Sequence, residues 1–428
     1  MEERAKDRFH LQRRIFSLTV VLALLGCTEG GAPGPSVPYF VTRVEDTTIF
    51  TSQRPEVLDT AVMTHVSRVG RFNGPEDHLI AGVESFTVGW RGEVYVADVG
   101  VRVFSPDGED VRWIAREGKG PGEVGTVRGM AVDRTGRLLI LDRSNARITV
   151  LDTSGAILDH WRLPYGRSTT GGSALVSFPS GETLLRFSPP LHTDERWRGF
   201  PKPIFLRFDS AGALLDTIFA PARFESKCTT RDDPHFAGGF WRDKREPFFP
   251  KIKWTATRSG ELVYGCPSEY EIDRVQSGGQ VSRIVHRREP MVEPPEVRDA
   301  FVEGLEEGAR RVGRDWQWKG ERPPEHKPYF HWLIAGRHGR LWVWPAHLRE
   351  SRPDPRDPFS KLWFDPRTGT FDVFDRDGRF LGPVLLPEGA RFQWFSGWGE
   401  PFVAGDTVWL VRRDSLDVEY VDRLLVEW

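Results

Sequence analysis

The sequence predicts an all-β protein, a six-bladed β-propeller, and three observations predict it. A glycine followed by a polar residue and an apolar run rich in β-branched, aliphatic and aromatic residues occurs six times. The first two intervals between copies are 44 and 45 residues, within the roughly 40–50 residues that one four-stranded blade occupies. Most copies are followed by a second apolar run and a tight turn that ends in glycine, as a hairpin between strands requires. The copies begin at Gly92, Gly136, Gly181, Gly260, Gly339 and Gly405.

The second run and its turn follow five of the six copies. The pairs are Val101–Phe104 with Ser105–Gly108, Ile148–Leu151 with Asp152–Gly155, Phe205–Phe208 with Asp209–Gly212, Tyr270–Ile272 with Gln276–Gly279, and Phe371–Phe374 with Asp375–Gly378. The last turn has the alternating carboxylates of a calcium loop, but the other ligand positions of such a loop are missing. We therefore interpret it as a hairpin turn like the others.

The sixth copy lacks a turn of this kind. After Gly405 the chain runs through Val418–Val421 to Trp428 without a further glycine turn. An unfinished blade would leave an open sheet edge, so another strand must close the ring. We expect Ala61–Val69 to be that strand, the outer strand of the sixth blade, because the Gly- and Pro-containing run that follows it resembles the one after the outer strand of the first blade. The extended segment Tyr39–Thr51 is expected to add to the same blade or to cover it.

The N-terminus has the pattern of an exported lipoprotein. Basic residues precede a short apolar run, Ile15–Leu25, which is too short to span a bilayer as a mature helix. The sequence before Cys27 resembles the lipobox of bacterial lipoproteins. We expect residues 1–26 to be a signal peptide, residues 27–38 to be a lipidated cysteine and a flexible tether, and residues 39–428 to form the propeller. The protein would then be lipid-anchored in the cell envelope, at the outer membrane facing the periplasm or exported. The alternative is that Cys27 is a buried cysteine in a transmembrane or signal segment.

Two cysteines remain after lipidation. Cys228 and Cys266 form an even pair in a compartment that is oxidising if the chain is exported, so the sequence favours a disulfide over two free buried thiols. This disulfide would fasten the long insertion before the fourth glycine strand to its blade.

Composition narrows the possible functions. The formal net charge is −2 at pH 7, and no basic excess supports binding of nucleic acid. The 16 tryptophans are expected mainly as fillers between twisted sheets. Neither a zinc-protease motif nor a nucleophile elbow is present. The sequence predicts no cofactor and no metal site.

Long insertions interrupt the repeats, and insertions are where repeat proteins usually carry function. They are Ser188–Lys202, Pro221–Pro250 and Glu289–Pro328. The last contains a predicted amphipathic helix at about residues 294–313, with Val297, Phe301 and Leu305 on one face. This helix is expected to pack on its own domain or, alternatively, to bind a partner. Basic and aromatic residues predict a binding mouth at one end of the channel: His235, Trp241, Arg242, Arg245, His331, Trp332 and His338.

The second blade resembles an NHL repeat. The resemblance rests on Gly129–Asp133, Gly136, Leu141–Asp142, Asn145, Arg147–Ile148 and Gly155. It implies that Asp142 and Arg147 link neighbouring strands and blades. With the lipobox and Lys119–Glu123, the chain resembles the NHL-like six-bladed propeller lipoproteins, a family of undefined function.

Two classes of function stay open. The first is a lipid-anchored binding or scaffold protein for a peptide, a glycan or another envelope protein. The alternative is an envelope enzyme of lactonase or lyase type that uses a metal in the central channel. Only Glu84, Asp133 and His331 are candidate metal ligands on the inner strands, which favours binding.

Overall fold

The computed structural model describes most of the propeller. The described residues are 39–53, 59–120, 122–164, 175–187, 204–219, 252–311, 323–346, 369–390 and 400–428, together with Pro221, Arg223, Cys228, Pro250 and Gln317. The predicted signal peptide, Cys27 and the tether lie outside them, as do His235, Trp241, Arg242 and Arg245. In the described part, no helix is long and apolar enough to cross a membrane.

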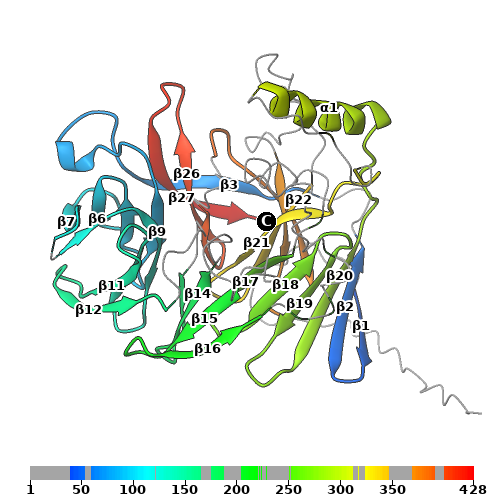
Figure 1. Cartoon of the computed structure of the whole chain (residues 1–428), viewed down its shortest axis with the longest axis horizontal. Helices are drawn as coiled ribbons and strands as arrows, with labels where there is room; N and C mark the ends of the chain where they lie inside the picture. The colour runs from blue at the N-terminus through cyan, green and yellow to red at the C-terminus, as the bar shows by residue number, and fades with distance from the viewer. Residues whose placement is uncertain are drawn as a thin grey trace, which may run out of the picture.

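The strands of the described residues form six sheets, which confirms the six-bladed propeller (Figure 1). Blade one contains β4 (Ser85–Val88), β5 (Val94–Ala97), β6 (Gly100–Phe104), β7 (Val111–Glu117) and β8 (Glu123–Val124). Blade two contains β9 (Val127–Val132), β10 (Leu138–Asp142), β11 (Arg147–Leu151) and β12 (Ile157–Arg162). Blade three contains β13 (Leu175–Ser177), β14 (Thr183–Phe187), β15 (Ile204–Phe208) and β16 (Leu214–Ile218).

Of the remaining three blades, blades four and six include strands from the N-terminal region. Blade four contains β17 (Lys253–Ala256), β18 (Leu262–Cys266), β19 (Glu271–Val275) and β20 (Val281–Arg287), extended by β2 (Thr47–Gln53) and β1 (Tyr39–Val44). Blade five contains β21 (Phe330–Ala335), β22 (Leu341–Pro345), β23 (Thr370–Phe374) and β24 (Phe380–Leu385). Blade six contains β25 (Phe402–Ala404), β26 (Thr407–Arg413), β27 (Glu419–Glu427) and β3 (Val62–Val69). A 3₁₀ turn, η1 (Glu76–His78), links β3 to blade one.

The ring closes where the sequence predicts. Strand β3 pairs antiparallel with β27, in a register that runs from Val69 opposite Val421 to Val62 opposite Glu427. The outer strand of blade six therefore comes from the N-terminal side of the propeller and its three inner strands from the C-terminal side. This confirms the predicted role of Ala61–Val69.

The prediction for Tyr39–Thr51 is wrong about the blade. This segment forms the β1–β2 hairpin, and β2 pairs in parallel with β20 of blade four, from Thr47 opposite Val281 to Gln53 opposite Arg287 (Figure 1, blue beside green). A buried hydrogen bond joins Ser52 Oγ to His286 Nδ1 at 2.9 Å. The alternation of side chains along a strand sets which face is buried but not which edge it joins, so the sequence left the partner open.

The hydrophobic core is divided among the six contacts between neighbouring blades. Each cluster of buried apolar side chains combines residues of two adjacent blades, and the six clusters complete the circle. The predicted role of tryptophan as a filler is confirmed for five residues that lie in these clusters: Trp161, Trp254, Trp342, Trp344 and Trp409.

The predicted turns have the chemistry that a tight hairpin needs. In the turn at Asp375–Gly378, the carboxylate of Asp375 accepts hydrogen bonds from the backbone N–H groups of Asp377 at 2.9 Å and Arg379 at 2.8 Å. Gly378 has a φ of +89°, a conformation that favours glycine. The carboxylate of Asp375 therefore serves the turn, as the sequence predicts.

The same turns bring neighbouring blades into contact. A Cβ on Gly108 would lie 2.2 Å from the carbonyl oxygen of Arg68 in β3, and one on Gly155 would lie 2.8 Å from that of Ile114 in β7. The glycine thus allows the outer hairpin of one blade to approach the outer strand of the preceding blade. Gly279 is different, since a Cβ there would have no neighbour within 4 Å.

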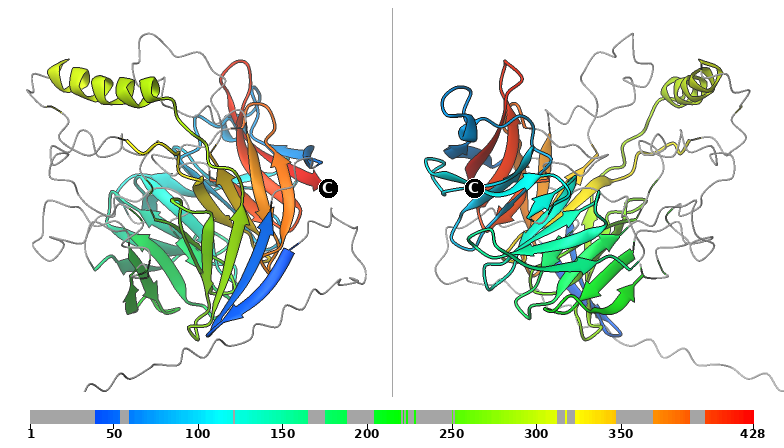
Figure 2. Two further views of the ribbon diagram at one scale, coloured as in Figure 1. Left: turned by 90° about the vertical axis from the view of Figure 1, so that its right-hand side faces the viewer. Right: turned by 60° about the vertical axis from the view of Figure 1, so that its left-hand side comes forward.

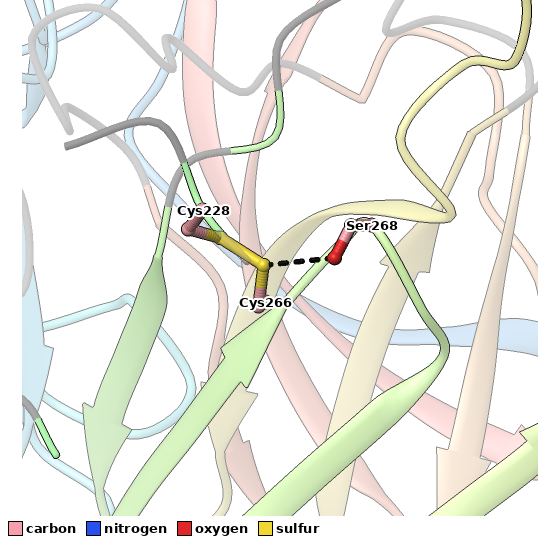
Figure 3. Close-up of a disulfide and its surroundings, with 3 residues drawn as sticks. All are labelled: Cys228, Cys266 and Ser268. Carbon is pink, nitrogen blue, oxygen red and sulfur yellow. Dashed lines mark hydrogen bonds between the residues drawn. A yellow bond between two sulfur atoms is a disulfide. The ribbon is translucent and has the colours of Figure 1, made fainter. Parts of the chain in front are cut away.

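The predicted disulfide is present. Cys228 and Cys266 are bonded with a Cα–Cα distance of 5.8 Å, and both are buried (Figure 3). Cys266 is the last residue of β18, so the bond fastens the connection between blades three and four to blade four, and Ser268 Oγ lies 3.1 Å from Cys266 Sγ.

The helical insertion between blades four and five is also confirmed. Helix α1 spans Pro295–Arg311, and Phe301 on its predicted apolar face is 1% exposed. In both views of Figure 2 this helix lies at the top of the molecule, whereas the β1–β2 hairpin lies at the bottom.

Candidate functional site

The two ends of the propeller differ in what they carry. Strands alternate in direction within each blade, so the turns between first and second and between third and fourth strands lie at one end, which we call the hairpin face. The connections between second and third strands, and those between blades, lie at the other end, which we call the insertion face. The strands that flank the three insertions predicted from the sequence end or begin at the insertion face.

Side chains from four blades meet around Trp332 near the insertion face. Lys253, Trp332 and Glu400 each lie four residues before the first residue of their inner hairpin, so they occupy the same level of the channel. The Trp332 indole N–H donates to Glu400 Oε1. Arg186 of β14 places its Cζ 5.4 Å, and Lys253 its Nζ 5.9 Å, from the centre of the Trp332 ring system. One indole thus contacts a carboxylate and two cations.

The blades on the other side contribute small residues at this level. Ser85 of β4 and Gly129 of β9 also lie four residues before their hairpins. At this position of the repeat, the charged and aromatic side chains therefore come from blades four to six, and Arg186 of blade three joins them.

Burial governs the electrostatics of this group. Desolvation lowers the pKa of Arg186, and the negative charge of Glu400 partly opposes it. Trp332 is only half-buried. An indole flanked by cations and a carboxylate can stack against an apolar ring or a sugar and also pair with charged groups of a ligand.

The described part of the predicted binding mouth is divided between the two faces. Trp332 lies near the insertion face, and His331 beside it on β21 is 3% exposed, within the blade. His338 lies in the turn Gly336–Gly339 at the hairpin face, where a Cβ on Gly405 would lie 3.3 Å from its Nδ1. Of these three, Trp332 alone takes part in the group of four.

Sequence reasoning missed Arg186, Lys253 and Glu400. A signal for two of them was available, since Lys253, Trp332 and Glu400 share one position in the repeat when the inner hairpins are aligned. Arg186 lies on a second strand, and only the folded blade shows that it reaches the same indole.

The three candidate metal ligands do not converge. The Asp133 carboxylate lies at the hairpin face, where it accepts hydrogen bonds from Thr135 and Arg137 of its own turn. Glu84 precedes β4, and burial raises its pKa while Arg128 opposes the shift. Glu84 and His331 belong to blades one and five, which are not neighbours. Among the described residues, no group of three or more His, Cys, Asp or Glu side chains is spaced to hold a metal ion.

Asp142 and Arg147 make the kind of contacts that the repeat resemblance implies. The buried Asp142 carboxylate accepts from the Gly125 N–H at 3.1 Å and from Asn145. Arg147 Nε lies 4.0 Å from that carboxylate, and Nη2 donates to the Glu123 carbonyl of blade one at 3.3 Å. Both residues therefore connect blade two to the end of blade one, while membership of the NHL-like family stays a prediction.

One comparison with known proteins supports the architecture. No family model and no curated protein matches the chain. A member of the DUF4221 family from Bacteroides vulgatus is similar in structure, with a TM-score of 0.50 and 11% identity over 86% of this chain and 98% of that chain. Virginiamycin B lyase from Staphylococcus aureus has a TM-score of 0.39 at 10% identity, over 85% of this chain and 94% of its own.

A protein described as a putative gluconolactonase has a TM-score of 0.40 at 13% identity, over 86% of this chain and 92% of its own. The first similarity supports the propeller fold alone. The lyase and the gluconolactonase say nothing about the activity of this chain. Their TM-scores are below that of the DUF4221 member, and their sequence identities to this chain are as low as its identity.

Proposed function

We propose that this propeller is a lipid-anchored binding protein of the cell envelope that takes a peptide or glycan ligand at the insertion face of its channel. The observation that carries the proposal is the convergence of Arg186, Lys253 and Glu400 on the half-buried indole of Trp332. A binding site of this kind combines an aromatic surface with a few placed polar groups that fix the orientation of a ligand. The strands that flank the insertions end or begin at the same face.

Two features support a place in the envelope. The disulfide between Cys228 and Cys266 is typical of a compartment that does not reduce thiols. The twelve residues from Cys27 to Pro38 precede the first described strand, and when extended they reach about 40 Å. The propeller would hang from the lipid on this tether. Envelope location and lipidation belong to the proposal.

Binding is tested with the mature domain from Tyr39 onward, applied to an array of peptidoglycan fragments and other oligosaccharides and to an array of short peptides. We expect a defined set of signals that Trp332→Ala removes. The control is Trp428→Ala, which removes another partly exposed tryptophan, 38% exposed, whose indole donates to Asp406. Thermal melting of both variants shows whether they are folded. Signals that survive in Trp332→Ala, or their complete absence with the folded wild type, would contradict the proposed site.

Anchoring is tested separately in cells of the source bacterium. Labelling with a palmitate analogue is expected to mark the full-length protein and to place it in the membrane fraction. Cys27→Ser should lose both the label and the membrane association. A labelled Cys27→Ser protein, or an unlabelled wild type, would rule out Cys27 as the anchor.

Metal analysis decides between binding and the enzyme alternative. Purified protein without an affinity tag is dialysed and its metal content measured per chain. We expect less than a stoichiometric amount of any transition metal or calcium. One tightly held metal per propeller would replace the binding proposal with a channel enzyme.

A further inference from the structure

A second group of long side chains lies at the mouth of the channel on the hairpin face. Five inner hairpins have the same turn, in which the N–H of a glycine at the fourth position donates to the carbonyl of the first. The second position of this turn therefore recurs around the same mouth. It is occupied, from blade one to blade five, by Trp90, Arg134, Pro179, Arg258 and Arg337.

Two of these arginines cross the channel. Arg258 of blade four donates from Nη1 to the Val132 carbonyl of blade two at 3.3 Å. Arg337 of blade five donates from Nη2 to the carbonyls of Val88 at 2.8 Å and Gly89 at 3.0 Å in blade one. Each contact joins blades that are not neighbours.

The two guanidinium groups lie against the same two rings. Their Cζ atoms are 5.2 Å and 4.5 Å from the Trp90 ring centroid, and 5.1 Å and 5.0 Å from that of Phe402. Trp90 is held in place by its indole N–H, which donates to the Asp133 carbonyl at 2.6 Å, and is 41% exposed. The mouth is thus open to solvent at its aromatic edge while the arginines are half-buried.

No carboxylate of the described residues pairs with either arginine. The acidic groups around this mouth are already engaged: Asp133 Oδ2 accepts from Arg137 Nε at 2.7 Å, and Glu261 Oε2 accepts from Arg274 at 2.5 Å. Glu93 accepts the N–H of Arg91 in its own turn at 3.2 Å, and Asp406 pairs with Arg340. By contrast, Arg102, Arg137, Arg274 and Arg283 each pair with a carboxylate.

The pair is electrostatically unfavourable without an anion. Burial, followed by the positive charge of Arg337, lowers the pKa of Arg258 to about 9. Burial also lowers the pKa of Arg337, and the negative charge of Glu93 opposes this shift. Two like charges brought together in a half-buried site destabilise each other, and the nearby carbonyl groups use only part of the ten N–H donors that two guanidinium groups supply.

We propose that the hairpin face of the channel is a binding site for an oxyanion, a phosphate or carboxylate group, held between the guanidinium groups of Arg258 and Arg337. The planar fork of arginine matches the two oxygens of either group. The rings of Trp90 and Phe402 fix both guanidinium groups beneath the anion and leave their edges free to donate. This site is separate from Trp332 and does not depend on the function proposed for that residue.

The test uses inorganic phosphate and, in a second arm, succinate, each added to the mature domain at constant ionic strength against chloride. We expect a saturable rise in melting temperature, since a ligand that binds only the folded state stabilises it. Isothermal titration calorimetry then gives the affinity, which should fall about tenfold or more in Arg258→Gln and in Arg337→Gln. Whichever arm binds more tightly identifies the phosphate or the carboxylate as the preferred group.

The matched control is Arg134→Gln, which removes the same charge from the same turn position in blade two. Arg134 is exposed and makes no hydrogen bond or ion pair with the described residues, so its replacement should leave both affinities unchanged. Arg337→Lys keeps the charge without the planar fork and should weaken binding less than Arg337→Gln. Trp332→Ala should bind phosphate as the wild type does.

Two results would overturn the proposal. One is a wild type that shows no saturable effect of either anion. The other is a loss of anion affinity in Arg134→Gln as large as in Arg258→Gln and Arg337→Gln. That result would show that the anions respond only to the overall positive charge. If the glutamine variants melt at much lower temperature in chloride, Arg337→Lys and Arg134→Gln still decide the question by calorimetry.

Discussion

Arg68 and Asp422 form a two-point ion pair across the strands that close the ring, with Nε 2.7 Å from Oδ1 and Nη2 2.9 Å from Oδ2. They lie directly opposite each other in the β3–β27 register. Asp422 is fully buried and also accepts from Arg412 at 3.0 Å. The hydrogen bond from Arg68 to Asp422 raises the pKa of Arg68 above its ordinary value. The joint between the two ends of the propeller is thus ionic as well as hydrogen-bonded through the backbone.

Removing the negative charge of Asp422 should weaken this joint. Asp422→Asn is expected to lower the free energy of unfolding by about 2 kcal/mol, less than the roughly 3–5 kcal/mol of a wholly buried pair because both arginines reach solvent. Urea denaturation of the mature domain measures the change. Arg71→Ala is the control, since its pair with Glu109 is exposed at both ends and should contribute less than about 1 kcal/mol. Equal effects of the two substitutions would show that Asp422 has no special part in closure.

Two glycines allow the cost of backbone strain to be distinguished from the cost of a close contact between blades. Gly108 and Gly279 occupy equivalent turns with φ of +80° and +82°, but only at Gly108 would a Cβ meet the neighbouring blade. Gly279→Ala should cost about 1 kcal/mol, from left-handed strain alone. Gly108→Ala should cost at least about 2 kcal/mol more, because the Arg68 carbonyl must move. Chemical denaturation of both variants gives the comparison, and a Gly279→Ala cost as large as that of Gly108→Ala would assign the whole effect to strain.

The disulfide between Cys228 and Cys266 should stabilise the propeller strongly. It joins residues 38 positions apart, for which the chain-entropy model gives about 4 kcal/mol. We expect a reducing agent to lower the urea midpoint of the wild type. The double variant Cys228→Ser and Cys266→Ser should have the lower midpoint from the start and should not respond to the reducing agent. A response of the double variant would point to an effect of the reagent elsewhere.

Asp152 should contribute to the acid stability of blade two. Hydrogen bonds from the Ser154 hydroxyl and the Ala156 N–H lower the pKa of Asp152 below its usual value. A lowered pKa in the folded state means that its stabilisation is present above about pH 4, the ordinary value, and is lost as the pH falls through the folded-state pKa.

The corresponding variant is Asp152→Asn. Its urea midpoint should lie below that of the wild type at pH 7, and the difference should shrink as the pH is lowered from 5 to 3. Asp46→Asn provides the comparison, since the exposed Asp46 carboxylate makes no hydrogen bond with the described residues. A difference between Asp152→Asn and wild type that is constant with pH would exclude a titrating carboxylate as its cause.

Much of the fold could be predicted because it is built from repeats that share a local sequence pattern. Gly92 and its five counterparts mark inner hairpins, where positive φ restricts the residue type, so the blade count follows from local chemistry. The closing strand could be predicted from the unfinished sixth blade. The partner of β2 could not, because its alternating pattern fits the edge of any sheet that has a free outer strand.

The candidate sites were harder to predict for a physical reason. Trp332 could be proposed for a binding site because it is aromatic. Arg186 could not, because it reaches Trp332 from the second strand of another blade. From the sequence, Arg258 and Arg337 are expected to be ordinary solvated turn residues, like Arg134. Only the ring brings two of these three turns to carbonyl groups across the channel, and nothing local distinguishes them from the third.

The pairing of β3 with β27 also determines when the ring can close during synthesis of the chain. Arg68 and Asp422 are separated by 354 positions, so the pairing edge of β3 has no partner until almost the whole propeller has been synthesised. Contacts between such distant segments form slowly, and an unpaired strand edge invites association with other chains. A chain that stops before Glu419 keeps that edge exposed. Ring closure therefore has to wait until β27 has been synthesised, because β27 is the strand with which β3 pairs.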